Sequence, residues 1–218
     1  MASYFYLEIH YTMNDRFIVS LDPSYTRTGI CILDLLNKNI YFHTASCKIG
    51  EKQFENVVHA AQSIVKQLSS IINDICGEAY FSMIMESPLP ASSMSPALYC
   101  LDSLIYNEFE SHITKTYNPS TLRSRIHGRK YDKSDSVNLA CKYLKILEDA
   151  GYTYYLIVDR ARKVPHDCCE ALLYLHLWLK DSGNKDFQFD NSEEIAAFKL
   201  RQKELKKREK LLLSSKET

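Results

Sequence analysis

Two short, almost wholly apolar segments constrain the fold of this chain most, because each of them ends in a carboxylate. The segment 16–22 reads RFIVSLD and runs into the turn-forming Pro23, and the segment 79–87 reads AYFSMIMES and runs into a loop rich in Ser and Pro. Such runs of apolar and β-branched residues are typical of strands buried on both faces of a sheet. We therefore expect a central sheet covered by helices, with an acidic residue at the end of each of two strands.

The segments around these strands alternate between strand and helix patterns. Residues 29–39 and 40–49 have the composition of two further strands, and residues 51–75 carry apolar side chains at the three-and-four spacing of an amphipathic helix. Further helices are predicted for residues 95–113, 134–151 and 165–181, and strand-like stretches lie near Tyr117 and after Gly151. This order predicts an α/β fold with a mixed five-stranded sheet flanked by helices.

The length of 218 residues suits one compact domain with short additions at its ends. We predict an N-terminal extension at residues 1–15, a core domain at 16–182 and a charged C-terminal tail at 183–218 that is helical. No apolar run approaches the roughly 20 residues that cross a bilayer, so a membrane protein is not expected. The 27 basic and 27 acidic residues balance, so any surface for a polyanion must be local.

The seven cysteines are odd in number and scattered, and none stands in a C-x-x-C pair. This pattern argues against a disulfide framework and against a zinc ribbon, and it predicts reduced thiols in the core. The first residues lack the basic and apolar regions of a secretory signal. We therefore expect a protein that is not secreted and stays inside the cell, in a bacterial cytoplasm or, if viral, in the cytoplasm or nucleus of a host.

Four carboxylates are the candidate metal ligands. Asp22 and Glu86 end the two apolar strands, and Asp167 and Glu170 lie three residues apart at the start of the last core helix, so they share a helix face. If the two strands are neighbours, all four carboxylates converge at one end of the sheet. Such a cluster needs cations to remain ionised, and its hard oxygen ligands favour magnesium or manganese.

Each of these residues also has an ordinary structural interpretation. Asp22 precedes Pro and could start a turn, Glu86 could be a solvated strand end, and Asp167 could complement a helix N-terminus. The metal-site hypothesis is preferred because the acidic residues end both apolar strands and also open the last helix. His166 can share the face of Glu170, although a local hydrogen bond is its more common role.

At four places the sequence resembles RuvC-type Holliday junction resolvases. FIVSLDPSYTRTGICILD resembles their first strand, turn and second strand, with Ser24 in place of the usual Gly, and FSMIMES resembles the strand that ends in a catalytic Glu. The block 118–144 resembles a basic loop before a helix, with Lys133 on the position of a family Lys. HDCCEALL resembles the motif D-x-x-D-A-L, with Glu170 replacing the second Asp. The resemblance spans about residues 16–180.

The resemblance implies an RNase H-like fold and an endonuclease that resolves four-way DNA junctions by paired nicks, in DNA recombination and repair. It implies a site with two Mg²⁺ ions, which Mn²⁺ can replace, held by Asp22, Glu86, Asp167 and Glu170. It also implies a homodimer, for which the apolar helix 95–113 is the expected interface. Short, divergent members of this kind occur in phages, large DNA viruses and bacteria.

A basic segment beside the proposed site is the candidate DNA surface, because phosphate contacts dominate nucleic-acid affinity. Lys133 is also expected to stabilise the developing charge on the phosphate. The predicted DNA-binding residues are Arg123, Arg125, Arg129, Lys130 and Lys133.

Three other functions compete with that of a junction-resolving nuclease. An actin-like or sugar-kinase ATPase would share the DPSYTRTG turn, but it needs two such domains and a Gly-rich adenosine site, which six glycines and this length do not supply. A nuclease of the same fold that acts on flaps or RNA–DNA hybrids stays open. A non-catalytic DNA-binding module on that fold also stays open, although the four acidic positions argue against it.

Overall fold

The computed structural model describes residues 15–47, 54–87, 96–127, 133–157 and 163–183, together with positions 196, 200, 203 and 204, which are helical. For residues 54, 55, 123, 127 and 133 this description covers the backbone alone. The predicted extension at 1–15 therefore lies outside the described residues except for Asp15. The predicted tail lies outside them except for Gly183 and the four helical positions.

A six-stranded mixed sheet forms the centre of the described part, with the strand order β5-β4-β1-β2-β3-β6. Strands β1 and β4 are parallel neighbours, and β2 pairs with β1 and with β3 in antiparallel fashion. The outer strands β5 and β6 run parallel to β4 and β3 respectively. The bounds are β1 Phe17–Asp22, β2 Arg27–Asp34, β3 Asn39–Ser46, β4 Phe81–Glu86, β5 Ile113–Tyr117 and β6 Thr153–Leu156.

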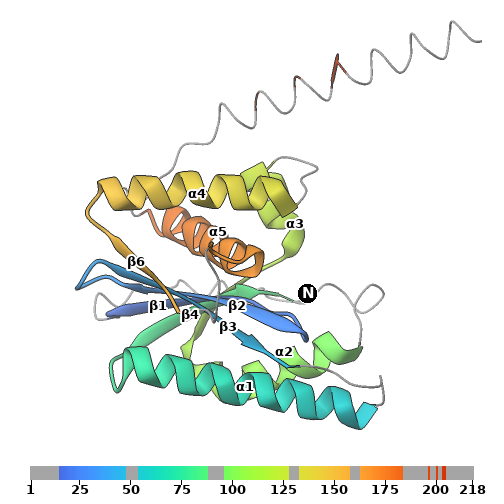
Figure 1. Cartoon of the computed structure of the whole chain (residues 1–218). Coiled ribbons are helices and arrows are strands. Elements are labelled where there is room, and N and C mark those ends of the chain that lie inside the picture. The colour runs from blue at the N-terminus through green and yellow to red at the C-terminus, as the bar shows by residue number, and fades with distance from the viewer. Residues whose placement is uncertain are drawn as a thin grey trace, which may run out of the picture.

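Helices cover both faces of this sheet (Figure 1). Helices α1 (Phe54–Cys76) and α2 (Pro96–Phe109) lie on one face, and α4 (Lys133–Asp149) and α5 (His166–Asp181) lie on the other, with the short α3 (Pro119–Leu122) beside them. The π-helical turn Arg123–His127 follows α3. Among the described helices, we find none with the length and apolar content to cross a membrane.

The α/β class and the mixed sheet are as predicted, but the number of five strands is wrong. The stretches near Tyr117 and after Gly151 both form strands, β5 and β6, at the two edges of the sheet. β6 is only four residues long, and its tyrosines are partly exposed, so it lacks the apolar signature of a central strand. The predicted helix 95–113 is also shorter, because a 3-10 turn at Glu110–His112 leads directly into β5.

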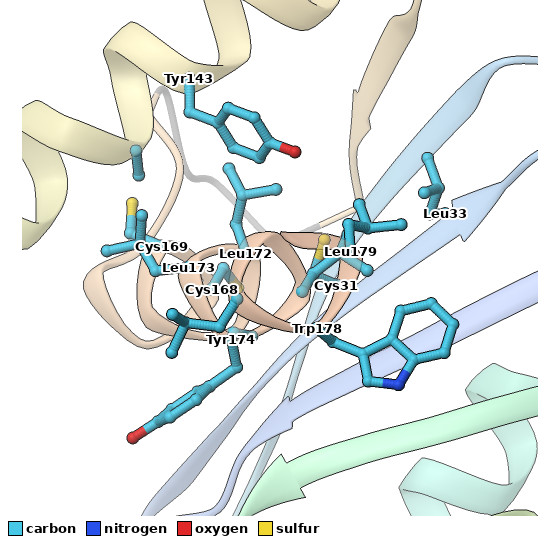
Figure 2. Close-up of a cluster of buried hydrophobic side chains, with 14 of the residues drawn as sticks. Cys31, Leu33, Tyr143, Cys168, Cys169, Leu172, Leu173, Tyr174, Trp178 and Leu179 are labelled. Atoms are coloured by element: carbon cyan, nitrogen blue, oxygen red, sulfur yellow. The ribbon is translucent and has the colours of Figure 1, made fainter. Parts of the chain in front are cut away.

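Helix α5 is buried along almost its whole length, since every residue from Cys168 to Leu179 is in the core. It lies between the sheet and α4, and Figure 2 shows the ring of Tyr143 directed from α4 toward it. All seven cysteines are free thiols, and Cys168 and Cys169 belong to this core as packing residues. A helix enclosed on all sides holds its first turn in a fixed position relative to the sheet.

Candidate metal centre

The pleat of the two central strands places Asp22 and Glu86 on the same face of the sheet. In β1, Ile18 packs in the core under α5, whereas Phe17, Val19 and Leu21 pack under α1 and α2. Since side chains alternate along a strand, Asp22 follows Ile18 and Ser20 on the α5 face. The same count places Glu86 on that face of β4, because Ile84 belongs to the α5 core. Leu21 pairs with Met85, so the two carboxylates stand side by side.

Helix α5 brings the third carboxylate, and Gly29 allows it to approach. A Cβ atom on Gly29 would lie 2.2 Å from the carbonyl carbon of Asp167 and 2.6 Å from the amide nitrogen of Cys168. Gly29 pairs with Asp22 across the hairpin, so the first turn of α5 rests on β2 directly beside the end of β1. The Ser20 hydroxyl donates to the carbonyl of Ala171 at 2.6 Å and ties the helix to β1.

Asp22, Glu86 and Glu170 form one acidic cluster, in which each offers an oxygen and these oxygens lie within 4.8 Å of one another. Asp22 and Glu170 are each only 8% exposed. Three ionised carboxylates at such distances repel by at least about 3 kcal/mol per pair at an effective dielectric constant of 20. Buried oxygens of this kind are the ligands that Mg²⁺ and Mn²⁺ prefer, so the donor set fits a divalent cation.

Two hydroxyl groups orient the carboxylates of the cluster. Tyr174, one turn after Glu170 in α5, donates to Oε2 of Glu86 at 2.5 Å, and Ser136 of α4 donates to Oε1 of Glu170 at 3.1 Å. Burial, with the nearby charge of Glu86, raises the pKa of Tyr174 far above its usual value, so its hydroxyl stays a donor. Such outer hydrogen bonds fix the direction of metal ligands.

Asp167, the fourth predicted ligand, is not part of this cluster. Its Oδ2 accepts from Nε of Arg27 at 2.5 Å, and its Oδ1 lies 3.4 Å from Nδ1 of His166. His166 also places Nε2 3.4 Å from Oε1 of Glu170, so the imidazole stands between the two carboxylates of the helix. Both Asp167 and Glu170 thus lie beside His166, but the described geometry pairs Asp167 with Arg27 at the edge of the cluster.

A further carboxyl group, Asp102, approaches from the opposite face of the sheet. It lies in α2, is 4% exposed, and its Oδ1 has no hydrogen-bond partner among the described residues. Burial, and to a lesser degree the charge of Glu86, raises the pKa of Asp102 to about 7. At neutral pH this side chain is thus near the midpoint of its titration, close to the candidate metal centre.

The predicted DNA-binding residues are only partly described. Arg129 and Lys130 lie outside the described residues, and the side chains of Arg123 and Lys133 do as well. The backbone of Lys133 begins α4, three residues before Ser136. Arg125 donates to both carboxylate oxygens of Asp181, at 3.0 and 2.5 Å, and so attaches the π-helical turn to the end of α5. Its guanidinium therefore has a structural partner that the sequence pattern did not indicate.

The helix expected at a dimer interface gives much of its apolar surface to the chain's own core. Leu101 and Ile105 of α2 are fully buried, and Leu98 and Leu104 pack against the same core, whereas Tyr106 is partly exposed. The apolar surplus on which the dimer prediction relied is therefore smaller than the sequence suggested.

Five residues that build this centre were not predicted from the sequence, although the sequence pattern around two of them could have indicated their role. Tyr174 lies at the helical i+4 position from Glu170, and Asp102 interrupts the apolar stripe of α2. Ser136 and Arg27 carry no such signal, because their roles depend on how distant elements pack. The missed residues are Arg27, Gly29, Asp102, Ser136 and Tyr174.

Comparison with solved structures gives the class of the fold. Thermus thermophilus RuvC matches with a TM-score of 0.50 at 13% identity, over 77% of this chain and 96% of that one. RuvC from T. thermophilus in complex with Holliday junction substrate matches with a TM-score of 0.48 at 13% identity, again over 77% of this chain and 96% of that one. The yeast mitochondrial Holliday junction resolvase Ydc2 matches with a TM-score of 0.44 at 10% sequence identity, over 74% of this chain and 76% of that one.

No protein-family model and no curated protein matches the sequence. The similarity is therefore one of structure alone: the chain has a fold like that of Thermus thermophilus RuvC, as the sequence motifs predicted. Within that fold, this chain has an acidic cluster that could bind a metal ion.

Proposed function

We propose that this protein is a magnesium-dependent endonuclease that resolves four-way DNA junctions by paired, symmetric nicks. The observation that carries the proposal is the cluster of Asp22, Glu86 and Glu170 at the end of two parallel strands of an RNase H-like fold. Branched DNA is chosen as the substrate because the four sequence motifs resemble RuvC-type resolvases.

The proposed chemistry is hydrolysis of a phosphodiester by in-line displacement. Asp22, Glu86 and Glu170 would hold two Mg²⁺ ions, replaceable by Mn²⁺, and Asp167 is the proposed fourth ligand. When bound, the ions would supply activation of water and stabilisation of the leaving oxygen. The residues of this chain do the positioning, since Tyr174 and Ser136 orient the carboxylates and Gly29 admits the first turn of α5.

The basic segment has the proposed role of holding the DNA backbone. Arg123, Arg129 and Lys130 are proposed to contact phosphates, and Lys133 to stabilise charge that develops in the transition state. Arg125 joins this set only if a phosphate competes with Asp181, to which it is bound. The position of Lys133 at the start of α4, one turn before Ser136, supports its placement near the cluster.

The test is cleavage of a panel of labelled substrates by the full chain with Mg²⁺. The panel holds a four-way junction, a flap, a linear duplex and an RNA–DNA hybrid, each also incubated with EDTA. We expect cleavage of the junction alone, at symmetric positions, into nicked duplexes that a ligase seals. Preferred cleavage of the flap or hybrid would identify another nuclease of this fold, and binding without cleavage would identify a non-catalytic module.

A homodimer is proposed because symmetric resolution needs two active sites, and the described residues of one chain form one acidic cluster. A two-fold axis would match the symmetry of the junction. Sedimentation of the protein at micromolar concentration, with and without junction DNA, measures this. A dimer in either condition supports paired nicking, and a monomer in both contradicts it.

A further inference from the structure

The contact with Arg27 distinguishes Asp167 from Glu170, the other acidic residue near the start of α5. Asp167 is 15% exposed and Arg27 is 51% exposed, so the guanidinium lies at the solvent side of the pair. Asp167 stands one helical turn from Glu170, which is inside the acidic cluster. The negative charge of Asp167 is thus neutralised by a protein cation that solvent and solutes can reach.

The turn that carries Arg27 is held in a defined shape. The hydroxyl of Thr28 donates to the carbonyl of Ser24 at 3.0 Å, and the amide of Ser24 lies 3.3 Å from that hydroxyl. The hydroxyls of Ser24 and Thr26 also lie 3.3 Å apart on the exposed side. Arg27 therefore begins β2 directly after a turn that hydrogen bonds hold in place. Asp22, the last residue of β1, lies close by, because it pairs with Gly29 of β2.

Arginine has a planar, permanently charged guanidinium, and carboxylate and phosphate groups bind it with similar geometry. A DNA backbone that reaches the acidic cluster brings phosphates to the place where Arg27 is exposed. An exposed ion pair contributes only about 0–1 kcal/mol, so a phosphate competes with Asp167 on nearly equal terms.

We propose that Arg27 is a substrate-sensing residue: it withholds Asp167 from the metal centre in the free protein, and a DNA phosphate that binds Arg27 releases Asp167 to bind metal. This inference rests on the proposed function and adds to it a coupling between DNA binding and assembly of the full ligand set. If this coupling exists, the free protein binds divalent cations less tightly than it would with all four carboxylates directed at the metal. Cleavage is then coupled to the arrival of a backbone.

The first measurement is the affinity of the full chain for Mn²⁺ without DNA, by calorimetry or by electron paramagnetic resonance. Arg27→Gln should bind Mn²⁺ roughly three- to tenfold more tightly than wild type, because Asp167 is freed and a positive charge is removed. Arg16→Gln is the matched control, since it breaks an Arg–Asp pair at the opposite end of the β1–β2 hairpin and should leave the affinity for Mn²⁺ unchanged.

A double-mutant cycle separates the release of Asp167 from the loss of a charge. If Arg27 acts through Asp167, the gain from Arg27→Gln falls in an Asp167→Asn background to the smaller part that the removed positive charge contributes alone. An equal gain in both backgrounds, or no gain in either, overturns the proposal. A wild-type protein that binds no Mn²⁺ overturns the proposed function as well, and this result is distinct from the others.

The second measurement is binding of a four-way junction with Ca²⁺ in place of Mg²⁺. Arg27→Gln should weaken binding by roughly three- to tenfold, and the slope of log affinity against log salt should fall by about 1, because one phosphate contact is lost. If Arg27→Gln changes neither the affinity for the junction nor its salt dependence, Arg27 does not exchange Asp167 for a phosphate, and the proposal is overturned.

Discussion

The hairpin of β1 and β2 carries a buried carboxylate at each of its two ends, and the two ends differ in how the charge is compensated. At one end Asp34, 1% exposed, accepts from the guanidinium of Arg16 and from the backbone amides of Leu36 and Asn37. At the other end Asp22 stands beside two further acidic side chains, which accept from the hydroxyls of Tyr174 and Ser136.

The way in which the charge is compensated distinguishes a structural carboxylate, Asp34, from a functional one, Asp22, on the same sheet. Burial alone would raise the pKa of Asp34, but Arg16 and Asn37 outweigh it, so that pKa is lowered and the charge is stable within the protein. The opposite end concentrates charge from β1, β4 and α5 instead. A protein retains such repulsion where a ligand compensates it, which favours a metal-binding role for that end.

The largest effect is expected for Asp22→Asn. Loss of a direct metal ligand should lower junction cleavage at least about a hundredfold, because changes to outer hydrogen bonds alone reach that size. Junction binding should stay equal or improve, since one charge that repels phosphate is gone. Rates come from single-turnover cleavage, and affinities from titration with Ca²⁺.

Asp34→Asn is the matched control for this change at the other end of the hairpin. It should lower the free energy of unfolding by roughly 2 kcal/mol through lost charge-assisted hydrogen bonds, with cleavage near the wild-type rate. Near wild-type cleavage by Asp22→Asn would contradict the metal centre, whatever Asp34→Asn does.

Gly29→Ala should give the next largest effect, because it acts where α5 rests on the sheet. The new Cβ would overlap backbone atoms of Asp167, which cannot rotate away, so either α5 or β2 must move. We expect a loss of about 3 kcal/mol in the free energy of unfolding, measured by urea titration, and a further loss of cleavage in the folded fraction.

Gly77→Ala provides the comparison for that variant. Gly77 has a φ of 58°, and a Cβ atom there would have no described atom within 4 Å, so alanine should cost only about 1 kcal/mol of backbone strain. Equal destabilisation by the two variants would show that the close approach at Gly29 does not matter.

Asp102→Asn should change the pH dependence of stability. The folded protein holds the Asp102 proton up to about pH 7, whereas the unfolded chain releases it near pH 4, so stability falls as the pH rises between these values. Asparagine at position 102 does not titrate, so the variant does not lose stability over this pH range. At pH 8 in EDTA we expect the variant to be more stable by about 2 kcal/mol, less than the full linkage energy because its carboxamide remains poorly partnered.

Thermal or urea unfolding at several pH values measures this prediction. The stability advantage of Asp102→Asn over wild type should fall from pH 8 toward pH 4 and change sign there, because the wild-type side chain is then neutral in the folded protein and only the cost of the poorly partnered carboxamide remains. A constant difference from pH 4 to pH 8 would contradict the raised pKa of Asp102.

The sequence predicted the strands that carry Asp22 and Glu86 because a strand buried on both faces has a simple apolar signature. It also predicted that Glu170 faces them, because helical spacing is local. It could not predict the ion pair of Arg27 with Asp167, since this contact joins residues 140 positions apart and depends on how closely α5 approaches β2. The edge strand β6 was ambiguous for the related reason that its pairing with β3, and not its own pattern, makes it a strand.

Tyr174→Phe should give the smallest effect and test how finely the cluster is oriented. Tyr174 and Tyr117 are stacked neighbours with ring centroids 6.2 Å apart, and each donates one hydroxyl to a carboxylate, Tyr174 to Glu86 and Tyr117 to Asp181. Tyr174→Phe and Tyr117→Phe should therefore lower the free energy of unfolding by a similar amount, about 1 kcal/mol. Only Tyr174→Phe should also lower cleavage, by roughly tenfold, because it frees Glu86 to leave its metal-binding orientation. Measured side by side, equal cleavage rates for the two variants would show that the hydroxyl of Tyr174 is structural in the way that the pairing of Arg16 with Asp34 is.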